Sequence, residues 1–181
     1  MNKILFSAII LLSFAACTST KEIASTTKEK KSERKLAKLT EVRKAVEARR
    51  FIIKVNRIYT TRGGMLELIP RSNYIIVDGE VASVSLGYVG NSYGGRAITG
   101  INFSGHTVKY EMVNNSTKNT YDISMKVARG GNTFDFYITV DQSGWCNVSV
   151  NNLNISTITY RGQVVPVSGN IKAPVASTES F

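Results

Sequence analysis

Strict alternation of apolar and polar residues is the feature that most constrains the fold of this chain. From Phe51 onward, apolar side chains recur at every second position in several runs, and the clearest are residues 84–88, 108–112, 121–127 and 134–140. A period of two places one set of side chains on the buried face of a β-strand and the other set on its solvated face. The runs therefore predict strands that each have one dry and one wet face.

Turn signals separate these runs and determine how the strands can be connected. They are Asp78-Gly79, Ser104-Gly105, residues 129–132, residues 142–144 and Arg161-Gly162. Short turns of this kind join antiparallel neighbours, and their spacing predicts roughly eight to ten strands. We therefore expect a mainly β domain over residues 51–168, an antiparallel meander forming a single sandwich or barrel-like domain. The pattern leaves both the sandwich and the barrel open.

The N-terminal residues have a different character. A positive start at Met1-Asn2-Lys3 precedes an apolar run from Ile4 to Phe14, and Ala15-Ala16 then leads directly to Cys17. This order is typical of a secretory signal, and the apolar run is well short of the ~20 residues that a spanning helix needs. A cysteine after two alanines resembles a bacterial lipoprotein signal. We predict a signal peptide over residues 1–16 and a lipid such as palmitate on Cys17. An ordinary secretory signal with an incidental cysteine is the alternative.

The predicted lipid also indicates where the chain is located. Thr18 follows the cysteine, so the Asp that retains some lipoproteins at the inner membrane is missing. We therefore expect an outer-membrane lipoprotein that faces the periplasm and contacts the membrane through the lipid on Cys17. An exported chain has no access to the nucleic acid of the cytoplasm, so we expect no nucleic-acid partner.

The net charge of +10 is concentrated next to the predicted anchor. Residues 18–50 hold eleven Lys/Arg and five Glu, a net of +6, whereas residues 51–181 have a net of only +3. Residues 17–27 comprise the lipidated cysteine and a predicted flexible tether, and residues 28–50 predict a basic amphipathic helix. Its narrow apolar stripe packs on the β domain or lies against lipid headgroups. Residues 169–181 are expected to form a loose C-terminal tail.

Several segments together resemble a known family. Phe51-Ile-Ile-Lys-Val, residues 86–93, Phe103, the hairpin at Gly144 and Ile158-Thr-Tyr-Arg-Gly162 follow the predicted helix in order. In this respect the chain resembles domain-of-unknown-function family 4251, which consists of bacterial envelope lipoproteins. The resemblance covers about residues 40–166, and it implies a fold and a compartment. It implies no catalytic residues, because the family has no assigned activity.

A glycine-rich stretch from Gly87 to Gly95 is the most unusual local feature. It is either a bent connection that needs glycine or a recognition loop, because tyrosines with adaptable polar neighbours and an Arg are typical of binding surfaces. The candidate recognition residues are Tyr88, Asn91, Ser92, Tyr93 and Arg96. Trp145 is a candidate exposed aromatic on the polar face of its strand. It is either covered by the N-terminal helix or marks a contact site.

Residues capable of catalysis are sparse and scattered. His106 is the lone histidine and follows a predicted turn, and Cys146 alternates with Val148 and Val150, which indicates a buried thiol. Three aspartates fall on the wet faces of predicted strands and could pair across them: Asp122, Asp135 and Asp141. We find no catalytic constellation, metal-ligand spacing or cofactor motif. We therefore expect a non-enzymatic module that binds a small ligand or an envelope protein. A purely structural envelope protein is the alternative, and a hydrolase is the third possibility.

Overall fold

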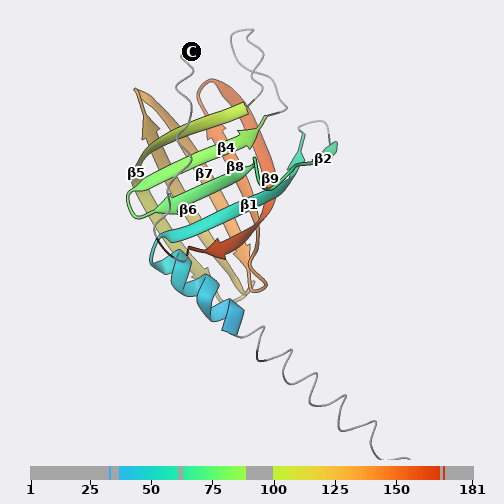
Figure 1. Ribbon diagram of the computed structural model, residues 1–181, viewed down its shortest axis with the longest axis vertical. Coiled ribbons are helices and arrows are strands. Elements are labelled where there is room, and N and C mark those ends of the chain that lie inside the picture. The colour runs from blue at the N-terminus through green and yellow to red at the C-terminus, as the bar shows by residue number, and fades with distance from the viewer. Residues whose placement is uncertain (1–32, 34–36, 61–62, 89–99, 168, 170–181) are drawn as a thin grey trace, which may run out of the picture. The chain divides into compact units, whose positions relative to one another are not determined.

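The alternating runs form antiparallel strands (Figure 1). The computed structural model describes residues 33, 37–60, 63–88, 100–167 and 169. Within these residues a helix spans residues 37–47, and none of the helical segments is long and apolar enough to cross a membrane. The strands are β1 (Arg50–Tyr59), β2 (Met65–Glu67), β3 (Tyr74–Asp78), β4 (Val81–Gly87), β5 (Gly100–Asn115), β6 (Thr120–Arg129), β7 (Asn132–Asp141), β8 (Trp145–Asn152) and β9 (Ile155–Pro166). The predicted mainly β fold is confirmed.

The sheet closes on itself. Strands β3 to β8 each pair with the next strand along the chain. Strand β1 pairs with β3 on one side and with β9 on the other, where Ile52 lies opposite Val165. This closure makes an eight-stranded barrel, and the short strand β2 pairs with β1 as an extra strand. Of the two architectures that the sequence pattern allowed, the structure is therefore the barrel.

Apolar side chains fill the interior of the barrel. An eight-stranded barrel is just wide enough for its own side chains, and here large residues belong to one core, including Phe51, Phe136 and Tyr160, each 0% exposed. The other inward residues include Ile53, Val55, Ile58, Ile75, Val77, Ala82, Val84, Leu86, Ile101, Phe103, Ile123, Met125, Val127, Ile138, Val140, Cys146, Val148, Val150, Ile158 and Val164. These side chains occupy the space that an enclosed ligand would need.

The helix covers one end of the barrel, which we call the capped end. Val42 and Val46, from the predicted apolar stripe, join the barrel core together with Ala45. The hydroxyl of Tyr110 on β5 donates a hydrogen bond of 2.9 Å to the carbonyl of Val46. Because strands alternate in direction, the β6–β7 and β8–β9 turns lie together at the opposite end, which we call the hairpin end. Of the two alternatives for the stripe, Val42 and Val46 therefore follow the first and pack on the β domain.

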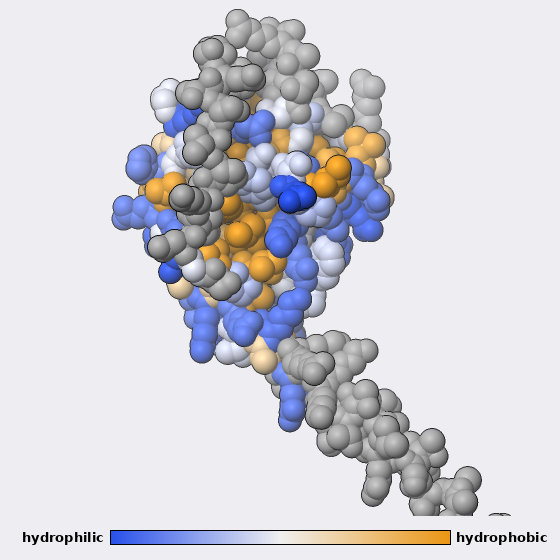
Figure 2. Space-filling view, in the orientation of Figure 1, coloured by the Kyte–Doolittle hydropathy of each residue, from blue (hydrophilic) through white to orange (hydrophobic). Residues whose placement is uncertain are grey.

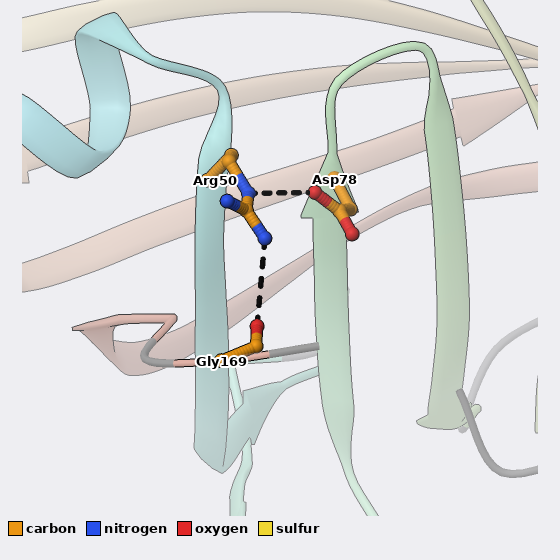
Figure 3. Close-up of polar contacts among 3 residues, drawn as sticks. All are labelled: Arg50, Asp78 and Gly169. Carbon is orange, nitrogen blue, oxygen red and sulfur yellow. Dashed lines mark hydrogen bonds and ion pairs between the residues drawn. The ribbon is translucent and has the colours of Figure 1, made fainter. Parts of the chain in front are cut away.

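Polar contacts of one arginine link neighbouring strands at the capped end (Figure 3). Arg50 at the start of β1 donates from Nε to Asp78 Oδ1 at the end of β3, over 2.9 Å. The same guanidinium donates from a terminal nitrogen to the carbonyl of Gly169, beyond β9, over 3.4 Å. One side chain thus links β1 both to β3 and to the chain that leaves β9.

Two predicted turns are wrong, and both contain a glycine that the barrel uses differently. Ser104-Gly105 lies inside β5 and Arg161-Gly162 lies inside β9. A Cβ added to Gly105 would stand 2.5 Å from the carbonyl oxygen of Ala128, and one added to Gly162 would stand 2.7 Å from that of Lys54. These glycines therefore allow close approach of neighbouring backbones within the wall, where a turn would end the strand.

The predicted dry face of residues 108–112 is wrong at one position. The β5–β6 register shifts between Thr107 and Lys109, so Val108 is left without a partner in the ladder and is 60% exposed. A bulge of this kind reverses which residues point inward, and Tyr110 and Met112 pack against the core as predicted.

The outer face of the wall formed by β1 and β3 is partly apolar. Ile52 lies opposite Ile76 on one side and Val165 on the other, and Ile76 is only 7% exposed although its strand neighbours point inward. Figure 2 shows hydrophobic side chains on this wall among hydrophilic ones. The three consecutive apolar residues of β3 therefore lie on both faces of the sheet, with Ile75 and Val77 inside the barrel and Ile76 outside.

Candidate functional site

A polar cleft lies at the hairpin end, on the outside of the barrel wall. It has a volume of about 330 Å³ and lies between the β6–β7 hairpin and the β8–β9 hairpin. Strands β6, β7 and β8 are neighbours in the sheet, so residues from both hairpins come together there. The lining residues are Lys126, Gly131, Asn132, Thr133, Asp135, Asn151, Asn152 and Leu153.

One row of side chains across three strands forms the floor of this cleft. Lys126 lies opposite Asp135, and Asp135 lies opposite Asn151. The ammonium of Lys126 stands 3.2 Å from Asp135 Oδ1, and both side chains keep substantial contact with solvent. An ammonium donates, a carboxylate accepts and an amide does both. The row therefore offers both kinds of hydrogen-bonding group while its charges balance.

The hairpins on either side of the cleft are tied to each other by Asn152. Its side-chain amide donates a hydrogen bond of 2.7 Å to the carbonyl of Thr133, and its Oδ1 accepts one of 2.8 Å from the backbone of Asn154. Asn152 is only 8% exposed, whereas the adjacent Leu153 is 95% exposed. A buried amide with both groups engaged holds the two hairpins in place, and it leaves Leu153 projecting into solvent.

The predicted recognition loop is described only at its stem. Gly87 donates to Asn73 Oδ1 over 2.6 Å and accepts from the hydroxyl of Tyr160 over 3.0 Å. Tyr88 is 4% exposed and belongs to the core, so its ring is not presented at a surface. The remaining candidates lie outside the described residues: Asn91, Ser92, Tyr93 and Arg96. Cys17, the predicted lipidation site, also lies outside them.

Trp145 is far along β8 from the cleft. It begins β8 at the capped end, whereas Asn151 and Asn152 end the strand at the hairpin end. The side chain is half-buried, and the guanidinium of Arg161 lies 5.6 Å from the centre of its ring. The structure therefore does not bring Trp145 together with the cleft.

The histidine and the buried thiol lie apart from each other. His106 is exposed on β5 with Val81 and Ala128 as its neighbours in the ladder, since the turn predicted before it is a strand. Cys146 is buried beside Val148 and Val150, as predicted, and burial raises the pKa of its thiol to about 12. A thiol that stays protonated is a poor nucleophile.

The three predicted wet-face aspartates serve separate contacts. Asp122 accepts a hydrogen bond from Thr139, Asp135 pairs with Lys126, and Asp141 accepts from Ser143 and Trp145 within its own turn. Among the described residues, no group of three or more His, Cys, Asp or Glu side chains is placed to hold a metal ion.

The cleft was not predicted from the sequence. The turn signal at residues 129–132 is present, but the second hairpin is marked by Asn151, Asn152 and Asn154 without any glycine. Asparagine accepts turn geometry and also supplies amides to a surface. An asparagine-rich turn at the same end as a glycine turn is the signal that could have located the cleft.

Comparison with known proteins bears on the fold. The sequence profile of DUF4251, a domain of unknown function, matches residues 33–164. A crystal structure of a DUF4251 family protein from Bacteroides eggerthii DSM 20697 is similar, with a TM-score of 0.62 and 17% sequence identity. The match covers 72% of this chain and 88% of that chain, and at this identity it shows the fold alone. No curated protein matches the chain.

Proposed function

The chain belongs to the DUF4251 family, and from this membership and the barrel geometry we propose that it is a non-enzymatic binding module of the cell envelope. It is held to the outer membrane, facing the periplasm, by a lipid on Cys17. It binds a small ligand or an envelope protein at the hairpin end of the barrel.

The division of the barrel into a filled interior and two unlike ends carries this proposal. Inward side chains occupy the interior, and Val42, Ala45 and Val46 of the helix cover the capped end. A partner must then meet the outside of the barrel. The cleft of about 330 Å³ at the hairpin end falls at the lower limit of volumes typical of small-ligand sites.

The path of the chain supports the proposed orientation. The polypeptide reaches β1 through the helix, so a tether ahead of the helix would join the domain at its capped end. An anchor attached there leaves the hairpin end free to meet a partner. The exposed Leu153 and the amides beside it would then be the groups that a partner reaches first.

The described residues also support a non-enzymatic role. A general acid or base acts through neighbours that set its pKa and orient it. His106 has Val81 and Ala128 beside it in the ladder, and the aspartates are engaged in separate structural contacts. Binding, for which exposed amides suffice, fits this distribution better than catalysis.

Crosslinking in intact cells tests the binding site. A photo-crosslinking amino acid in place of Leu153 should form a covalent adduct with a protein partner. If the site binds a small ligand, adding free ligand should reduce the amount of that adduct. The matched control is the same amino acid in place of Val113, which is 63% exposed on β5 near the capped end. Equal adducts at both positions, or none at either, would favour a purely structural envelope protein.

The anchor needs its own experiment. Cys17→Ser should move the protein from the membrane fraction to the soluble periplasmic fraction and should abolish labelling with a palmitate analogue. Retention of the label, or membrane association unchanged by the substitution, would contradict the proposed lipid.

A further inference from the structure

Tyr137 is an exposed aromatic side chain in the middle of a polar wall. It lies on the outer face of β7, between the buried Phe136 and Ile138, and it is 56% exposed. Its partners in the ladder are Ser124 on β6 and Ser149 on β8. Because both neighbours are small, neither can cover the phenol ring. The ring is therefore a flat apolar surface open to solvent.

Polar groups adjoin this ring on the side of the cleft. Two residues along β7, Asp135 occupies the same outer face, and it is flanked by Lys126 and Asn151. A step of two residues along a strand is about 6.6–6.8 Å. An aromatic surface therefore stands roughly one sugar ring away from a row that both donates and accepts hydrogen bonds.

We propose that this outer face of β6, β7 and β8 binds a neutral oligosaccharide. The C–H-bearing face of one sugar ring lies on Tyr137, and hydroxyls of the neighbouring unit bond to Asn151 and to the Lys126–Asp135 pair. The cleft at the hairpin end receives the next part of the chain. The inference rests on the proposed binding function and names the chemical class of the ligand.

The charges on this face distinguish among ligands. The ammonium of Lys126 is already paired with Asp135 at 3.2 Å, so the row has no uncompensated cation for a phosphate or a carboxylate. A protein partner favours an apolar centre to the contact, whereas serine, lysine, aspartate and asparagine surround Tyr137. A hydroxyl-rich neutral ligand can bond to Asn151 and to the Lys126–Asp135 pair without leaving either of these two charges unpaired.

Titration calorimetry with the detergent-solubilised full chain tests the proposal. The probes are neutral xylo-, cello-, malto- and manno-oligosaccharides of six units. At least one should bind, and Tyr137→Ala should weaken its binding by about tenfold or more, as for an aromatic at the centre of a contact. Asn151→Ala should weaken it by a few-fold. Val113→Ala is the matched control, because it removes a similarly exposed side chain elsewhere on the barrel.

The outcomes separate this inference from the proposed function. Binding of none of these probes at millimolar concentration, or equal affinity in Tyr137→Ala and the parent chain, would overturn the sugar proposal. A protein adduct at position 153 without sugar binding would leave the binding function standing and exclude the sugar. Circular dichroism of each variant shows whether the barrel is intact, and Tyr137→Phe, which retains the ring, should bind as the parent does.

Discussion

The described residues at the two ends of the barrel differ in their chemistry. At the capped end, Val42 and Val46 extend the hydrophobic core into the helix, and the hydroxyl of Tyr110 donates a hydrogen bond to the carbonyl of Val46. At the hairpin end, Asn152 joins two turns by hydrogen bonds, and Leu153 and Asn151 project outward. The comparison predicts that stability depends more on the buried residues of the capped end than on the exposed residues of the hairpin end, such as Leu153.

The largest expected effect comes from a charge placed at each end. Val46→Asp buries a carboxylate at a site that is 0% exposed and should lower the free energy of unfolding by about 4 kcal/mol or more. Leu153→Asp, at a site 95% exposed, should change it by less than about 0.5 kcal/mol. Urea denaturation of both variants measures the difference. Similar losses would show that the hairpin end also determines stability.

A smaller loss is expected in the wall between the two ends. Gly105→Ala would place a Cβ within 2.5 Å of the carbonyl oxygen of Ala128, so the neighbouring strands must separate, at a loss of about 2–3 kcal/mol. His106, the next residue along β5, is exposed, so His106→Ala serves as the control and should change the free energy of unfolding little. A thermal midpoint for Gly105→Ala equal to that of the control would mean that the wall accommodates a side chain there.

The hydrogen bond at the capped end should contribute a moderate amount. Tyr110→Phe keeps the ring but removes the hydroxyl that donates to the carbonyl of Val46, and the expected loss is about 1 kcal/mol. Hydrogen exchange at the last turn of the helix should also quicken. Tyr137→Phe removes an exposed hydroxyl elsewhere and should leave both measurements unchanged. An unaltered exchange rate in Tyr110→Phe would show that apolar packing alone holds the helix.

The smallest effect is expected at the cleft. Lys126→Ala breaks a solvent-exposed ion pair with Asp135, and such pairs contribute about 0–1 kcal/mol. The thermal midpoint should therefore shift by only a few degrees at most, and raising the salt concentration should remove the difference. A large, salt-independent loss would mean that the cleft is part of the structural framework.

The sequence predicted the walls of the barrel better than its ends. Alternation identified β6 and β7, since Ile123, Met125, Phe136 and Ile138 are each nearly or fully buried. Glycine was the residue from which structure was hardest to predict, because it occurs both in turns and where two strands approach closely. Only the position of the partner strand distinguishes a turn from a close approach. Gly105 and Gly162 show this ambiguity.

The candidate site was harder to predict because it depends on pairing. Asn151 meets Asp135 only through the β7–β8 register, and Lys126 joins them only through β6–β7. No local pattern in one strand contains that row. Tyr88 was a reasonable recognition candidate by composition, yet alternation with Val84 and Leu86 already placed it on the dry face, where the structure buries it.

The pairing of β1 with β9 has a consequence for how the chain folds. Closure joins Phe51 to Pro166, so the final ladder forms between segments at opposite ends of the barrel sequence. Contacts so distant in sequence are slow to form, because a long loop must close before any of them is gained. A chain that emerges with its N-terminus first therefore has an open sheet, with the edges of β1 and β8 exposed, until β9 is available. During that interval β1 and β8 can pair with other chains, and chaperones would protect the protein most at that stage.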